Sequence, residues 1–238
     1  MANIDITNID LGSVLAGDAH RAFRDELLTF AAEDTFVPGT ILARRLVALA
    51  PVIGDITRAG TSDGTVTAAA VVHGPVPLVG AYVLTCIEAV ANGGIFKLVD
   101  PNGGLVAGYL AMTAGAGAAT TFEAGGLSFI VTDGANNFEV GDTVTITVAA
   151  DGKLVPYAVA GAGGVQVPCA VLTYEAYKAA IGDLPVRALV AGDVNVARLV
   201  IDADGDASNV TAAILDQLRE RGIIPVSVQQ LSMIDNPQ

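Results

Sequence analysis

The sequence predicts a mainly β protein, in which short strands dominate and only one or two short helices are added. The two clearest strands are Leu127–Thr132 and Thr143–Val148, where apolar side chains alternate with polar ones. A period of two residues is typical of a strand that buries one face. Asp133-Gly134 breaks the chain between the two runs, and both runs are rich in the β-branched residues that strands favour.

A change of texture divides the chain into two parts. Between residues 51 and 150, turn residues recur at short intervals and separate short runs rich in Val, Thr, Ile and Tyr. Such spacing indicates a β-sandwich or barrel. We therefore interpret residues 51–150 as a β-sandwich-like domain, inserted into a discontinuous domain of residues 18–50 and 151–238. Besides the two strands above, the expected strands of the insertion are Thr65–Val72, Gly80–Val90, Gly94–Val99 and Leu105–Met112.

Two helices are expected in the discontinuous domain. The first follows a candidate N-cap, Asp18, and the alternative for its second half is a strand at Leu27–Ala31. The second helix is capped by Asp206 or Ser208, runs through Arg221 and stops at Gly222. The apolar stripes at helical spacing are Ala19, Ala22, Phe23, Leu27, Phe30 and Ala31 in the first, and Val210, Ala213, Ile214 and Leu218 in the second.

The other elements of this domain are expected to be strands. A turn at Pro38-Gly39 precedes an apolar run that reaches Leu49. The central proline of Lys153–Val159 predicts an edge strand. Residues 1–17 show no sustained period and are interpreted as an arm that meets a partner. The remaining expected strands are Val165–Thr173, Ala188–Asp193 and Asn195–Asp202, the last two joined by a turn at Gly192-Asp193, and Ile223–Leu231.

Composition argues against several partners. The formal net charge of −13 would repel nucleic acid, so no direct binding to DNA or RNA is expected. Gly, Pro and Thr interrupt the two long uncharged segments, residues 65–87 and 101–122, so no membrane span is expected either. The first residues resemble no signal peptide. Only 16% of residues are charged and 52% are apolar, which indicates that other subunits cover part of the surface.

No pattern of catalytic or ligand-binding residues stands out. Asp202-Ala-Asp204-Gly-Asp206 lacks the glycine and glutamate positions of a calcium loop and is interpreted as a turn. The glycine-rich runs at 115–117 and 161–164 lack the surroundings of a phosphate cradle and are interpreted as loops. The spacings of His20, His73, Cys86 and Cys169 fit no zinc pattern, and both cysteines are expected to be buried free thiols. We expect no enzyme, no cofactor and no metal.

Several short motifs resemble the head decoration proteins of tailed bacteriophages, the lambda-like capsid decoration family. The family order of a PGT strand, a Lys-Leu strand and an Ala-Val-Leu strand is similar to Phe36–Arg44 (FVPGTILAR), Lys153–Tyr157 (KLVPY) and Val167–Leu172 (VPCAVL). Longer members have counterparts of Val186–Ile201 and of the ending LRERGI at Ile223. Some members carry an extra β domain that resembles Asn92–Phe96, Asp100–Gly103 and Phe138–Asp142.

The resemblance implies a small β-barrel or β-tulip-like decoration domain that trimerises on the capsid. Its partners would be the major capsid protein and two further copies of itself, at three-fold or quasi-three-fold sites of the DNA-filled head. The protein would be made in the bacterial cytoplasm and would end on the outer surface of the virion, with the inserted domain projecting outward. The family arm maps onto residues 1–17, where Ile4, Ile6, Ile9 and Leu11 are the candidate capsid-binding residues.

Three other functions remain open at this level. The inserted domain would serve as a virion-surface adhesin if it binds a host or glycan ligand, and this function is compatible with capsid decoration. The chain would otherwise be a tail or baseplate structural protein. A hydrolase built from carboxylates assembled in space has no motif in its favour.

Overall fold

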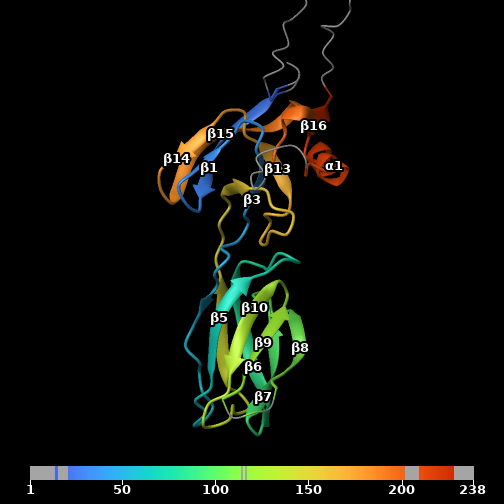
Figure 1. Cartoon of the computed structure of the whole chain (residues 1–238). Coiled ribbons are helices and arrows are strands. Elements are labelled where there is room, and N and C mark those ends of the chain that lie inside the picture. Colours follow the sequence, from blue (N-terminus) through green and yellow to red (C-terminus); the bar gives the residue numbers. More distant parts are fainter. Residues whose placement is uncertain (1–13, 16–20, 114, 116, 202–208, 228–238) are drawn as a thin grey trace, which may run out of the picture. The chain divides into compact units, whose positions relative to one another are not determined.

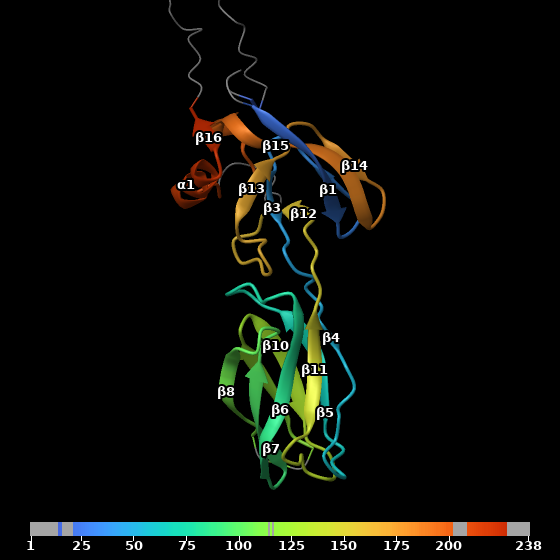
Figure 2. The same ribbon diagram turned by 180° about the vertical axis from the view of Figure 1, so that it is seen from behind.

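A computed structural model of the chain describes residues 14–15, 21–113, 115, 117–201 and 209–227 (Figures 1 and 2). The chain forms two compact units. Unit 1 contains residues 1–44, 153–159 and 165–238, and unit 2 contains residues 45–152 and 160–164. Both units are built mainly from strands, which confirms the expected mainly β fold.

Unit 1 is a closed five-stranded β-barrel. Each strand pairs with the next around the ring, and the ring closes because the first strand also pairs with the last. All neighbours are antiparallel except β1 and β12, which run parallel where Leu28 lies opposite Leu154. In ring order the strands are β1 (Ala22–Phe30), β12 (Leu154–Pro156), β3 (Ile41–Arg44), β13 (Pro168–Val171) and β15 (Gly182–Asn195).

Unit 1 contains two apolar clusters because its strands bury side chains on both faces. One cluster holds Leu28, Phe30 and Leu154 with residues of β3, β13 and β15 and with Phe36, Leu172 and Ala176. The other packs Ile41 and its neighbours against α1 (Ala212–Glu220), a helix whose apolar stripe is Ile214 and Leu218. β16 (Ile223–Val226) extends the sheet by pairing parallel to the end of β15. A small separate sheet pairs β2 (Asp34–Phe36) with β14 (Ala176–Lys178).

The helix expected after Asp18 is wrong over its described part, because residues 22–30 form strand β1. All nine residues of β1 pair with β15, from Ala22 opposite Ala191 to Phe30 opposite Gly182. This long-range ladder outweighs a weak helical spacing, since local propensity is easily overridden by tertiary pairing. The alternative of a strand near Leu27–Ala31 was closer to the structure, although the strand begins earlier.

The expectation of an edge strand at Lys153–Val159 is also wrong, since β12 lies between β1 and β3. The missing N–H of Pro156 is tolerated because β1 pairs with β12 only at Leu154. The expected turn at Gly192-Asp193 is likewise absent, and β15 runs through both residues. Gly192 is required there for another reason: it has a φ of 123°, and a Cβ would lie 3.2 Å from the Cα of Arg21.

The second expected helix is confirmed in its position and its end. It begins at Ala212 with Thr211 as N-cap, so the expected cap at Asp206 or Ser208, which both lie outside the described residues, is wrong. Gly222, with a φ of 82°, terminates it as predicted. The last strand ends at Val226, and residues 228–231 of the expected strand lie outside the described part of the chain.

Unit 2 contains two sheets around one apolar core. The core includes side chains from both sheets and a chain of aromatic contacts, in which Phe96 meets Phe138 edge-on and the pairs Phe96–Phe122 and Phe122–Phe129 are tilted. All six strands expected in this unit form, whereas β4 and β9 were not predicted by the sequence analysis. The first sheet has the order β5 (Thr65–Val71), β10 (Leu127–Thr132), β9 (Ala119–Ala124), and the second has the order β4 (Val52–Ile53), β11 (Thr143–Val148), β6 (Gly80–Val90), β7 (Gly93–Val99), β8 (Leu105–Ala111).

The contacts place the boundaries of the long segment of unit 2 at Arg45 and Gly152. The sequence analysis had placed them at residues 51 and 150. Val47 explains the earlier start, because it packs in the core of unit 2 and pairs with Ala150. Residues 160–164, expected to be a loop of the discontinuous domain, also belong to unit 2. The carbonyl of Gly163 accepts a hydrogen bond of 2.7 Å from the N–H of Leu46.

Candidate interaction surfaces

The candidate capsid-binding residues Ile4, Ile6, Ile9 and Leu11 lie outside the described residues. The nearest described residue, Val14, is buried in unit 1. Its carbonyl accepts a hydrogen bond of 2.8 Å from the N–H of Asn195, and the next residue, Leu15, pairs with Val194. The chain is therefore attached to the end of β15 immediately after the segment that carries these four residues.

Among the described residues, His73, Cys86 and Cys169 do not come together in a metal site. In the described part of the chain, no group of three or more His, Cys, Asp or Glu side chains could hold a metal ion by side chains alone. His73 is exposed, and its Nδ1 lies 2.9 Å from the carbonyl oxygen of Gly161. Cys86 is buried as expected, Cys169 is only half-buried, and burial raises the pKa of both free thiols. His20 and residues 202–206 lie outside the described residues, as do parts of the 115–117 run.

An open groove of about 300 Å³ marks the outer surface of unit 1. The guanidinium of Arg187 lies 5.5 Å from the ring centroid of Phe23, a cation–π contact. The N–H of Arg187 donates a hydrogen bond of 2.7 Å to the hydroxyl of Tyr174, which holds that ring beside the groove. Leu27, on the same strand as Phe23, is 44% exposed. We call the set Phe23, Leu27, Thr173, Tyr174 and Arg187 the Tyr174 surface.

Further apolar side chains of unit 1 are exposed around the β14–β15 connection. Ile181, in the turn between these strands, is 74% exposed, and Tyr177 is also exposed. The hydroxyl of Tyr177 donates a hydrogen bond of 2.8 Å to Glu33, and the carboxylate of Glu33 raises the pKa of that hydroxyl. Large exposed apolar side chains are candidates for burial by a partner, particularly where several occur in one unit.

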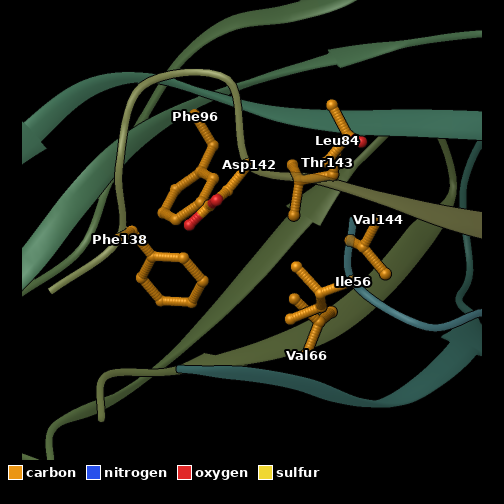
Figure 3. Close-up of a pocket in the computed structure, with 8 residues that line it drawn as sticks. All are labelled: Ile56, Val66, Leu84, Phe96, Phe138, Asp142, Thr143 and Val144. Atoms are coloured by element: carbon orange, nitrogen blue, oxygen red, sulfur yellow. The ribbon is translucent and has the colours of Figure 1, made fainter. Parts of the chain in front are cut away.

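The cavity beside Phe96 and Phe138 in unit 2 is too small to bind a ligand (Figure 3). Its volume is about 10 Å³, which is at the limit for one water molecule. Most of its lining is apolar, and the carboxylate of Asp142 points toward the same region as the rings of Phe96 and Phe138. The lining residues are Ile56, Val66, Leu84, Phe96, Phe138, Asp142, Thr143 and Val144.

The carboxylate of Asp142 has a structural explanation. It accepts hydrogen bonds from the N–H of Ala59 at 2.6 Å, from the N–H of Glu139 at 3.0 Å and from the hydroxyl of Ser62. Burial alone would raise the pKa of Asp142, but these hydrogen bonds and the charge of Arg58 outweigh it, so the pKa is lowered. Asp142 therefore stays ionised and joins the segment 59–62 to the turn before β11.

A second open groove, of about 490 Å³, lies on unit 2 between β4 and β5. Ala68 in β5 has a φ of 52°, which is uncommon for a residue other than glycine and coincides with a register shift in the β5–β10 ladder. The groove is lined by Pro51, Ile53, Gly54, Asp55, Val66, Thr67, Ala68 and Ala69. This concave surface of unit 2 is large enough for an external ligand.

Comparisons with models of protein families, with curated proteins and with solved structures found no match to this chain. Within the described residues, the structure contains no helix of the length and apolarity needed to cross a membrane. The resemblance to decoration proteins therefore rests on the sequence motifs alone.

Proposed function

We propose that this chain is a structural virion protein, without enzymatic activity, that binds the outside of a phage capsid. In this proposal it binds as a homotrimer at three-fold or quasi-three-fold sites and stabilises the DNA-filled head. Its partners are the major capsid protein and further copies of itself.

One structural relationship carries the proposal. The three segments with the family motifs become three adjacent barrel strands, in the order β12, β3, β13. Leu154 lies opposite Arg44, and Val171 lies opposite Ile41, although unit 2 separates β3 from β12 in the chain. Motifs that are scattered along the sequence thus form one continuous sheet, which supports their origin in a single domain.

The exposed apolar residues of unit 1 support a role in assembly. Leu27 and Tyr174 belong to the Tyr174 surface, and Tyr177 and Ile181 lie on or beside β14. Association is favourable for a barrel that exposes such side chains, because the free energy falls when copies of the chain or another protein cover them. The small share of charged residues in the chain agrees with such burial.

The experiment is a binding assay with capsids from which this protein has been stripped. The test variant replaces Ile4, Ile6, Ile9 and Leu11 with serine, and the matched control replaces Asn3, Thr7 and Asn8 with serine. We expect the test variant to melt at the wild-type temperature and to bind capsids at least tenfold more weakly, whereas the control binds normally. Loss of binding would follow from the loss of apolar contacts at the capsid surface.

Two results would contradict the proposal. Wild-type protein that does not bind stripped capsids at micromolar concentration would remove the decoration function altogether. The second result is a low stoichiometry on purified particles. A tail or baseplate component is present in far fewer copies than a capsid decoration protein, so such a count would identify the chain as one.

The groove between β4 and β5 favours a second, compatible function for unit 2, namely binding of a host-surface or glycan ligand. Its volume is in the range of small-molecule sites, and strained backbone such as that at Ala68 is common where ligands bind. A glycan array probed with the full chain tests this. Ala68→Asp is expected to abolish any binding, and signals that survive this substitution would exclude the groove.

A further inference from the structure

Asp133, in the loop that follows β10, is a buried carboxyl group without a hydrogen-bond partner. The residue is 3% exposed, and neither side-chain oxygen forms a hydrogen bond of acceptable geometry with the described residues. Its backbone is well held, because its N–H donates to the carbonyl of Ala118 at 2.9 Å. A buried carboxylate that lacks donors or a counter-charge is strongly destabilising, so this position needs an explanation.

A second carboxylate, that of Asp63, is held beside the same loop. Its Oδ1 accepts a hydrogen bond of 2.8 Å from the N–H of Asn136, and its own N–H donates to the carbonyl of Asn136 at 3.3 Å. Gly134 allows this approach, because a Cβ there would lie 1.9 Å from the same oxygen of Asp63. The carboxylate of Asp63 therefore lies directly against the residue that follows Asp133.

The charges at this end of unit 2 are not balanced locally. Burial raises the pKa of Asp133, the N–H of Gly134 opposes this rise, and the negative charge of Asp63 adds to it. The nearby cation is Arg58, whose guanidinium donates to the hydroxyl of Ser62 at 3.1 Å and to the carbonyl of Gly64 at 2.8 Å. Arg58 acts on Asp142 and is not among the groups that shift Asp133.

We propose that Asp133 and Asp63 bind a calcium ion between the β10–β11 loop and the loop before β5. Calcium prefers six to eight oxygen ligands in flexible geometry. The two loops would supply the oxygens of Asp133, the second oxygen of Asp63 and backbone carbonyls, and water would complete the shell. The ion would neutralise the unpartnered carboxylate and join the two loops.

Only two carboxylates contribute, so the affinity belongs to the weak class of extracellular modules, about 10⁻⁴ to 10⁻³ M. Calcium at this concentration occurs outside cells, where a virion protein functions, but the inference does not depend on the proposed function. The site concerns unit 2 alone and would exist in any protein with this fold.

The test is thermal unfolding of the full chain at pH 7 in EDTA and in 5 mM CaCl₂, together with calorimetric titration of calcium. In the wild type we expect calcium to raise the melting temperature of one transition by roughly 5 °C, as a ligand specific for the folded state does. Asp133→Asn and Asp63→Asn should remove the shift. Glu123→Gln, an exposed acid of the same unit that belongs to neither candidate site, should keep it.

Three outcomes would overturn the site. The first is the absence of both a calcium-dependent shift and calorimetric heat in the wild type. The second is an equal shift with MgCl₂ or with NaCl at matched ionic strength, which would show general screening of the net charge. The third is a wild-type response in Asp133→Asn. If Asp133→Asn does not fold, Asp63→Asn and the wild-type titration decide between calcium binding and a simple protonated carboxyl.

Discussion

The N–H of Gly152 donates a hydrogen bond of 2.7 Å to the carbonyl of Arg45, and these residues are the first and last of the long segment of unit 2. Just outside this segment, Arg44, which precedes Arg45, lies opposite Leu154, which follows Gly152 by two residues, in the ladder between β3 and β12. The two ends of the insertion are therefore adjacent. An insertion with adjacent ends adds little loop-closure entropy to its host.

Removal of the insertion should consequently leave a folded barrel. The register places Arg45 opposite Lys153, so replacing residues 46–152 with Asn-Gly would convert β3 and β12 into a hairpin with a two-residue turn. We expect the shortened chain to show a cooperative melt and a β-type circular dichroism spectrum. Residues 45–152 expressed alone should behave in the same way.

Measurements on the shortened chain and on residues 45–152 together decide whether the two units fold independently. If the shortened chain is insoluble and residues 45–152 remain unfolded, the two cores depend on each other and the division into autonomous domains is wrong. Replacing residues 51–150 instead provides a control, because that shorter deletion leaves Val47 without its core. We expect that variant to be the less stable of the two.

Asp142→Asn should destabilise unit 2 by about 2 kcal/mol at pH 7, because charged hydrogen bonds to Ala59, Ser62 and Glu139 are lost or weakened. The pKa of Asp142 is lowered in the folded state, so the unfolded state binds more protons at acidic pH. The contribution of Asp142 is therefore complete above the unfolded pKa, near 4, and is lost as the pH falls through the lower native value.

Scanning calorimetry at several pH values measures this effect. The difference between wild type and variant should shrink below about pH 4, whereas the exposed control Asp55→Asn should differ little from wild type at any pH. A constant difference across the acid range would show that the lost packing of Asp142, and not its charge, matters.

Gly39→Ala should destabilise unit 1 by about 3 kcal/mol or more. Gly39 has a φ of 97°, and a Cβ there would lie 1.8 Å from the carbonyl oxygen of Arg198. Gly103→Ala is the matched control, because Gly103 also has a positive φ, of 84°, but open space around it. The control should cost about 1 kcal/mol in unit 2. Equal losses, measured by calorimetry, would rule out the steric explanation.

The free protein should be a homotrimer. The small share of charged residues and the exposed side chains of Leu27, Tyr177 and Ile181 motivate this expectation. Sedimentation equilibrium at micromolar concentration should give a mass of about three chains. A monomer at that concentration would contradict a preformed trimer.

Alternation predicted unit 2 better than unit 1, and the reason is physical. Strands such as Thr143–Val148 bury one face, so their sequence carries the period of the strand. Unit 1 buries both faces of several strands, and Ile41, Leu42 and Ala43 are all fully buried in succession. Such strands lose their alternation. β1 was interpreted as a helix for another reason: of its nine residues only Leu28 and Phe30 are buried, so alternation is confined to its end.

The polar clusters of unit 2 could not be predicted at all. Ser62 and Asp142 are 80 positions apart in the chain, and Asp63 and Asn136 are 73 positions apart. Asp133-Gly134 was correctly interpreted as a break between two strands. Local sequence does not show which loops meet. No sequence pattern therefore indicated that Asp142 is ionised and hydrogen-bonded or that Asp133 is buried without a partner.

The position of β3 before the insertion also determines the order in which the protein can fold on the ribosome. β3 emerges before unit 2, but its two neighbours in the barrel, β12 and β13, are synthesised only after residue 152. Both edges of β3 therefore remain unpaired while more than a hundred residues are translated, for at least several seconds at typical rates. Any delay in the folding of unit 2 exposes the nascent chain to aggregation through these edges.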